Sequence, residues 1–135
     1  MTTFVVVGLA GGIIFLFLDF VLNVNPLAQR LSEPYRPIAR KKMPLAAAVV
    51  IDLLLGFAMA GFFLLLRPAF PGGPVLGAGI SFGFLTWFFR VLMSALSHWV
   101  MFNIPLKTLM YSVGAGLLEM LALGLFYAVA FSSFP

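Results

Sequence analysis

The sequence predicts an all-α integral membrane protein in which four transmembrane helices form an antiparallel bundle. Of its 135 residues, 63% are hydrophobic and 9% are charged, and the mean hydropathy is +1.15. A soluble domain of this length needs more charged residues to cover its exterior, so lipid must be the main solvent. Four apolar stretches are each long enough to cross roughly 30 Å of hydrocarbon. They lie near residues 4–24, 45–66, 75–101 and 106–131, and we expect them to form one domain over residues 1–135.

The first two spans have clear boundaries. Residues 4–24 follow no positively charged segment of the kind that opens a cleaved secretory signal, so we expect them to be a retained span. Asn and Pro stop this helix at residues 23–26. The second span follows Met43 and Pro44, and proline suits the start of a helix.

The later boundaries rest on proline and glycine. Residues 67–74 contain three prolines and two glycines, which predicts a tight reversal between the second and third spans. The third and fourth spans are separated by the short segment 103–105, which ends in proline. Apolar residues flank this segment on both sides, so a long, tilted or bent third span is compatible with the pattern.

The basic residues predict the orientation, because Lys and Arg near span ends are retained in the cytoplasm. The first loop contains five of them: Arg30, Arg36, Arg40, Lys41 and Lys42. Lys107, at the start of the fourth span, lies on the same side of the membrane, and Arg67 lies on the other side. We therefore expect the 25–44 loop to be cytoplasmic, both termini to be non-cytoplasmic, and the protein to be a multi-pass protein of a bacterial inner membrane.

Each predicted span contains one ionisable residue: Asp19, Asp52, Arg90 and Glu119. Each such group costs about 2.5–3.5 kcal/mol near the bilayer centre unless it finds a partner. A rise of 1.5 Å per residue places Asp19 and Asp52 at similar depths, within reach of the long Arg90 side chain. We therefore expect an intramembrane salt bridge from Arg90 to Asp52, Asp19 or both, with Glu119 as a competing partner.

Residue spacing places this polar cluster on the inward helix faces. On the third span Thr86, Arg90, Ser94 and His98 recur every four residues and form one polar stripe. Small residues on the same faces predict close helix packing. These glycines are Gly8, Gly12, Gly56, Gly79, Gly83 and Gly116.

The sequence offers little support for other chemistry. It contains no cysteine, it has one histidine, and Glu119 lacks the Glu-x-x-His pattern of di-iron bundles, so we predict no metal site and no catalytic residue. No cofactor is predicted, although haem ligation through His98 and a bound lipid or quinone remain alternatives. We expect membrane lipids as partners, and no nucleic acid, because the cations follow the pattern of a topology signal.

Two functions fit these features. The first is a non-catalytic structural or accessory subunit that oligomerises or docks in a larger membrane complex, in which the Asp/Arg/Glu cluster holds the helices together. The alternative is a proton-coupled small transporter or channel with Glu119 as the titrating site, because ionisable groups inside a bilayer commonly mark proton or ion paths. The sequence favours a non-enzymatic role in both cases.

Overall fold

The computed structural model describes residues 1–42, 44–70 and 73–133, and within these ranges the chain is helical and has no strand. The elements in order are α1 (Thr2–Val24), α2 (Pro26–Leu31), η1 (Glu33–Tyr35), α3 (Leu45–Leu66), η2 (Arg67–Ala69), α4 (Val75–Trp87), η3 (Phe88–Leu92), α5 (Met93–Met101) and α6 (Leu106–Ser133). Four helical segments are long and apolar enough to cross a membrane, which confirms that part of the prediction. The reversal predicted at 67–74 is described only in part, because residues 71 and 72 lie outside the described residues.

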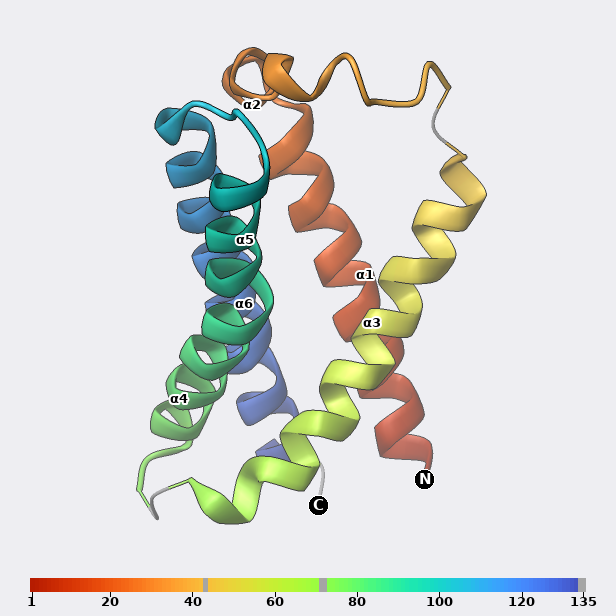
Figure 1. The fold of residues 1–135 in the computed structure, drawn as a ribbon. Helices are drawn as coiled ribbons and strands as arrows, with labels where there is room; N and C mark the ends of the chain where they lie inside the picture. The colour runs from red at the N-terminus through yellow and green to blue at the C-terminus, as the bar shows by residue number, and fades with distance from the viewer. Residues whose placement is uncertain (43, 71–72, 134–135) are drawn as a thin grey trace.

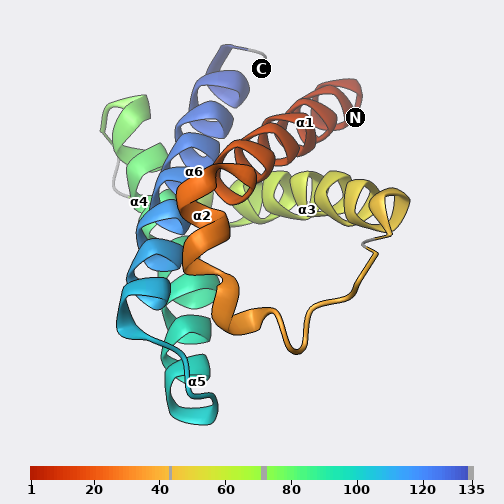
Figure 2. The ribbon, with the colours of Figure 1, turned by 90° about the horizontal axis from the view of Figure 1, so that it is seen from above.

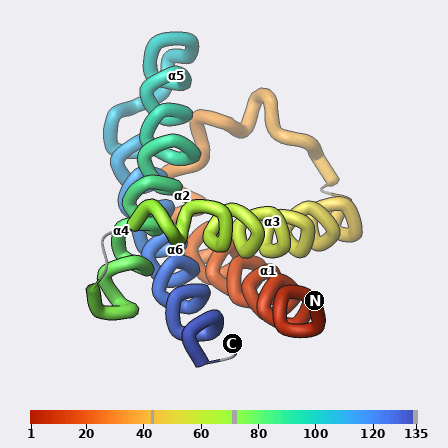
Figure 3. Tube along the Cα trace, turned by 90° about the horizontal axis from the view of Figure 1, so that it is seen from below, coloured from red at the N-terminus to blue at the C-terminus, as the bar shows by residue number. Residues whose placement is uncertain are grey.

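The four spans are arranged as two helix pairs rather than as an even bundle. Helix α1 packs mainly against α3, and α4 packs mainly against α6, while α1 and α6 join the two pairs. Successive spans alternate in direction, and the N-terminus and the end of α6 lie at the same end of the molecule (Figure 1). Seen from that end, α3 runs at a steep tilt across to the start of α4 (Figure 3). We call this the terminal end, and the opposite end the loop end.

Glycines bring the backbones of each pair together. A Cβ atom on Gly12 would lie 2.8 Å from the Cα of Leu53 in α3, and Gly56 of α3 meets the Gly12 backbone in turn. In the second pair, a Cβ on Gly79 would lie 2.8 Å from the carbonyl oxygen of Gly124 in α6. The remaining small positions named from the sequence also lie at helix contacts: Gly8 against Phe57, Gly83 against Leu121 and Gly116 against Val91. Such close approach is how helices gain van der Waals contact in lipid.

Aromatic rings fill the space between the pairs. Phe63, Phe82, Tyr127 and Phe131 are buried and contact one another, with Phe63 and Phe82 meeting edge to face at 5.2 Å between ring centroids. The Tyr127 hydroxyl donates a 2.7 Å hydrogen bond to the carbonyl oxygen of Gly56. This buried bond links α6 to α3 and satisfies a hydroxyl that would otherwise be costly in an apolar environment.

At the loop end the chain turns through a corner built on Asn25. Its side-chain amide donates to the Leu22 carbonyl and to the Tyr111 hydroxyl, and its side-chain oxygen accepts from the Ala28 amide. Asn25 therefore ends α1 and caps α2, with Pro26 at the first position of α2. Thr108 of α6 donates to the Leu31 carbonyl at 2.6 Å, which fixes the end of α2 on the fourth span.

The two pairs separate toward the loop end. Helix α3 makes little contact with α4 or α5 in the described part of the chain. From above, the segment after α2 arcs away from the helices before it reaches the start of α3 (Figure 2). The loop end is therefore the less tightly packed half of the molecule.

Two glycines of α3, one in close contact with α1 and one with room for a methyl group, give a test of this packing. Gly56→Ala should destabilise the protein by about 1–3 kcal/mol, because the new methyl group meets the α1 backbone, which cannot rotate away. Gly61→Ala is the matched control, since its Cβ finds only ordinary contact with Phe4 at 3.7 Å, and we expect a change within about 0.5 kcal/mol. Thermal unfolding in one detergent measures both variants. Equal melting temperatures would contradict the described α1–α3 contact.

Candidate functional site

The site is centred on Arg90, which lies on a π-helical turn in the third span. The turn, η3, continues α4 into α5 without a break and adds a residue to the helical repeat. Just before it, the Thr86 hydroxyl donates to the Phe82 carbonyl at 2.8 Å, and the Trp87 indole donates to the Val113 carbonyl of α6 at 2.9 Å. Single π-turns within α-helices are frequent at functional sites, because they redirect side chains.

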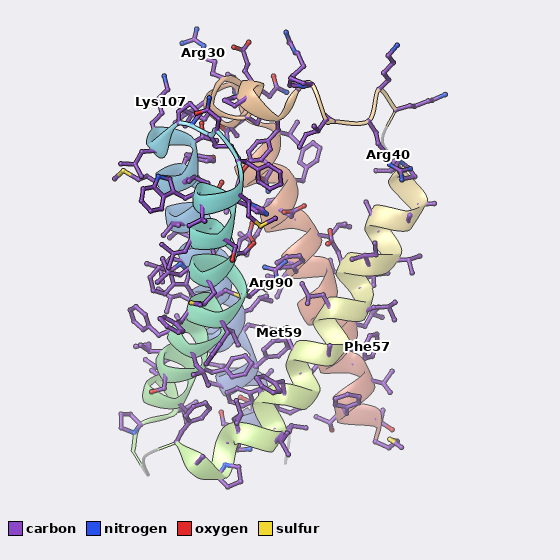
Figure 4. All side chains as sticks on the ribbon, in the orientation of Figure 1. Arg30, Arg40, Phe57, Met59, Arg90 and Lys107 are labelled. Atoms are coloured by element: carbon purple, nitrogen blue, oxygen red, sulfur yellow. The ribbon has the colours of Figure 1, made fainter. Side chains whose placement is uncertain are left out.

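The Arg90 guanidinium lies over an aromatic ring rather than on a carboxylate. Its central carbon is 4.8 Å from the centroid of the Phe15 ring, and Phe15 itself is buried in α1. Figure 4 shows the Arg90 side chain leaving its helix toward α1. A cation over a ring face is attracted by the ring quadrupole, most strongly where water is scarce.

The salt bridge expected from the sequence is absent from the described residues. Among residues 1–42, 44–70 and 73–133 no basic and acidic side chains approach within 4.0 Å, so Arg90 forms no direct ion pair with Asp19, Asp52 or Glu119 there. The guanidinium rests on the Phe15 ring instead, a contact that residue depth alone does not reveal. The helix that carries Asp52, α3, also has little contact with the helices on either side of Arg90.

The four charged groups nevertheless interact at longer range. The positive charge of Arg90 acts on Asp19, Asp52 and Glu119, and both aspartates act on Glu119. Each group comes from a different span. The structure therefore brings the four ionisable residues into one electrostatic cluster without direct contact, and we call these four residues the charged cluster.

Glu119 is the most enclosed member of the charged cluster. Its side chain is only 5% exposed, in the middle of α6. No described residue donates a hydrogen bond to its carboxyl group, yet no side-chain polar atom in the described ranges is both fully enclosed and without a partner. The Glu119 oxygens are therefore not fully enclosed, although the residue as a whole is buried.

The other two acids lie closer to the loop end. Asp19 is partly buried and accepts a 2.7 Å hydrogen bond from the Asn23 side chain. Asp52 is also partly buried, and with Asp19 it lines a groove of about 560 Å³ between α1 and α3. We call this the acidic groove; its walls are otherwise mainly apolar and include Leu16, Phe20 and Val49.

Two further cavities meet at Arg90. One, of about 350 Å³, lies between η1, α5 and α6 and is lined by the polar side chains of Tyr35, Arg90, Ser94, His98 and Ser112; we call it the cationic pocket. The other, of about 490 Å³, lies between α3 and α4 and is lined by Thr86, Arg90 and apolar residues. Three of the four residues in the predicted polar stripe therefore share one cavity, and Thr86 opens onto the next.

The chain matches no family model, no curated protein and no solved structure. The described residues hold no group of three or more His, Cys, Asp or Glu side chains placed to bind a metal ion. His98 stands instead between two rings, with centroid distances of 6.5 Å to Tyr35 and 5.7 Å to Phe102.

Sequence reasoning missed several residues that shape the site. Phe15, which supports the guanidinium, is one of sixteen phenylalanines in a lipid-like sequence, and nothing in its position marks it. Tyr35 and Ser112 enter the cationic pocket from elements other than the third span. The sequence pattern marks Asn23 only as a helix end, although its spacing of four residues from Asp19 is the signal that finds their hydrogen bond.

The contact between Arg90 and Phe15 can be measured by a double-mutant cycle. Arg90→Met and Phe15→Leu should show a coupling energy of about 0.5–1 kcal/mol, because each substitution removes the same cation–ring contact. Phe17→Leu is the control partner, since its ring is 64% exposed on the outside of α1, and it should show no coupling with Arg90→Met. Chemical or thermal unfolding of the four proteins in each cycle gives these energies. Coupling equal to that of the control would contradict the contact.

Proposed function

We propose that the protein is a proton-coupled small transporter or channel in which Glu119 is the group that binds and releases the proton. The observation that carries this proposal is the buried Glu119 carboxyl, which has no hydrogen-bond donor in the described residues although its oxygens are not fully enclosed. A carboxyl used only to hold helices together would be expected to sit in a direct polar contact. Carboxyl groups in such surroundings are typical of proton relays in membrane transporters.

The arrangement of the helices supports movement around this site. Each pair is held by its own glycine contacts, and the pairs meet chiefly through α1, α6 and the aromatic core. Two rigid pairs that separate toward one end can rock about the contact at the other end, as in alternating access. The charged cluster lies between the pairs, where such a motion changes the distances between its members.

The unpaired Arg90 fits a cycle of protonation. When Asp19 and Glu119 carry protons, the guanidinium rests on Phe15; when they lose them, it is drawn from the ring onto a carboxylate. The direct salt bridge expected from the sequence is therefore proposed as the deprotonated state. We also propose that the 25–44 loop faces the cytoplasm, with both termini outside, in a bacterial inner membrane, because the basic residues gather at the loop end.

Proton movement gives the test of this function. Wild-type protein in liposomes loaded with a pH-sensitive dye should carry protons inward under a potassium diffusion potential, or should do so once a substrate is supplied. Glu119→Gln should reduce this flux to the level of protein-free liposomes, because the amide cannot titrate. Glu33→Gln is the matched control, since it removes an exposed acid of η1 and should leave the flux unchanged. An active Glu119→Gln variant would contradict the proposal.

A second candidate function is an accessory subunit that oligomerises or joins a larger membrane complex. The observation that favours it is an apolar groove of about 490 Å³ on the outside of α5 and α6, lined by Leu96, Trp99, Met110 and Gly114 among others. Gly114 has no neighbouring atom within 4 Å of where a Cβ would stand, so this small residue makes no close contact within the chain. Small residues on a lipid-facing surface are typical of helix–helix contacts between subunits.

Particle mass in mild detergent tests the second candidate. A subunit of this kind should elute as an oligomer or with a second protein, and Gly114→Phe should shift it toward the mass of a single chain, because the ring occupies the groove and the Cβ at this position meets no atom within 4 Å. Leu118→Phe, on an exposed position of the same helix outside the groove, is the control and should leave the mass unchanged. A wild-type particle with the mass of one chain would contradict an accessory role.

A further inference from the structure

The charges around Arg90 are segregated between two cavities. The acidic groove contains both aspartates and no basic residue. The cationic pocket contains Arg90 and His98 and no acidic residue. Every other polar side chain on its wall is a hydroxyl, from Tyr35, Ser94 and Ser112. The two cavities therefore differ in the ligand charge that they favour, although both adjoin the same charged cluster.

We propose that the cationic pocket binds a small organic anion, with the Arg90 guanidinium on its carboxylate or phosphate group. Arg90 is an exposed residue and makes no ion pair within the described residues, and its guanidinium presents a planar set of donors that fits an oxyanion in bidentate geometry. Ser94 and His98 follow it at intervals of one helical turn toward the loop end, so donors line the path from the loop to Arg90. A volume of about 350 Å³ is at the small end of the range of ligand sites.

The pocket has the form of a ligand site rather than of an empty packing defect. Its walls combine the five polar groups with apolar side chains, including Val91 and Leu109, so one side of a ligand can be held by polar contacts and the other by dispersion. Tyr35 stands over the loop end of the pocket, where its ring meets the edge of His98. The ligand therefore reaches Arg90 from the loop end, past these two rings.

The pH dependence expected for anion binding rests on the proposed proton coupling. Arg90 faces Asp19 on α1, Asp52 on α3 and Glu119 on α6, with His98 on its own helix and Tyr35 on η1. An anion must compete with the three carboxylates for one guanidinium. Protons on these acids remove the competition, so the anion binds more tightly as pH falls. Anion and proton would then cross the membrane together.

Binding of two probes of the same shape and opposite charge tests the proposal. Protein in phosphatidylcholine nanodiscs is titrated with benzoate, benzylammonium and inorganic phosphate by calorimetry at pH 6 and pH 8. We expect benzoate or phosphate to bind, more tightly at pH 6, and benzylammonium not to bind. Preferential binding of benzylammonium, or no binding of either anion, overturns the proposal.

Two variants assign the binding to this pocket. Arg90→Gln should raise the dissociation constant of the anion by about tenfold or more, the usual loss for a hydrogen bond to a charged group. Ser94→Leu keeps the charge but fills the pocket, and should weaken binding even if Arg90→Gln fails to fold. Ser97→Leu is its matched control, because Ser97 is exposed on α5 and does not line the pocket. Equal dissociation constants of the anion in Ser94→Leu and Ser97→Leu would overturn the assignment to this pocket.

Two further arms identify the source of the anion and separate this inference from the proposed function. In nanodiscs that contain phosphatidylglycerol, loss of benzoate binding assigns the pocket to a lipid phosphate, and retained binding assigns it to a soluble anion. Glu119→Gln should still bind benzoate without a gradient. If the wild type binds the anion but moves no protons, the proposed proton coupling is rejected and the anion pocket stands. If it moves protons but binds no anion, the anion pocket is rejected and the proton coupling stands.

Discussion

A charge placed within hydrocarbon must be matched by a counter-ion, a proton, water or a ligand, and the rest of this structure follows from that constraint. Four ionisable side chains lie within the spans, and the described residues provide no direct counter-ion to any of them. Arg90 has the face of Phe15, Asp19 has one amide donor, and Glu119 has neither. Accessible space beside these groups is therefore a physical requirement of the sequence as well as a feature of the fold.

The two ends of the molecule differ in how tightly their helices pack. Toward the terminal end, glycine contacts and the rings around Tyr127 hold the pairs together. Toward the loop end, α3 parts from α4 and α5, and the cationic pocket and the acidic groove lie in this looser half. Stable packing at one end allows polar groups to remain solvated at the other, and it provides a fixed contact about which the pairs can move.

Much of the secondary structure was predictable, because local rules govern it. Asn25, Pro26 and Pro44 stop or start helices through their own backbone and side-chain chemistry, and the small residues at Gly12, Gly56 and Gly79 mark where backbones meet. The partner of Arg90 was not predictable. It depends on a π-turn that no residue type specifies, and on one phenylalanine among sixteen whose neighbours come from another span. The Tyr127 hydrogen bond to Gly56 was equally unpredictable, because it joins residues 71 positions apart.

Infrared difference spectroscopy of the reconstituted protein tests most directly whether Glu119 exchanges a proton with water. We expect the carbonyl stretch of a protonated carboxyl group to appear and disappear as the pH on the loop side changes, and this band to be absent from Glu119→Gln. The band should be unaffected by Glu33→Gln. A spectrum in which no carboxyl band responds to pH, or in which the responding band persists after Glu119→Gln, would contradict a titrating site at this position.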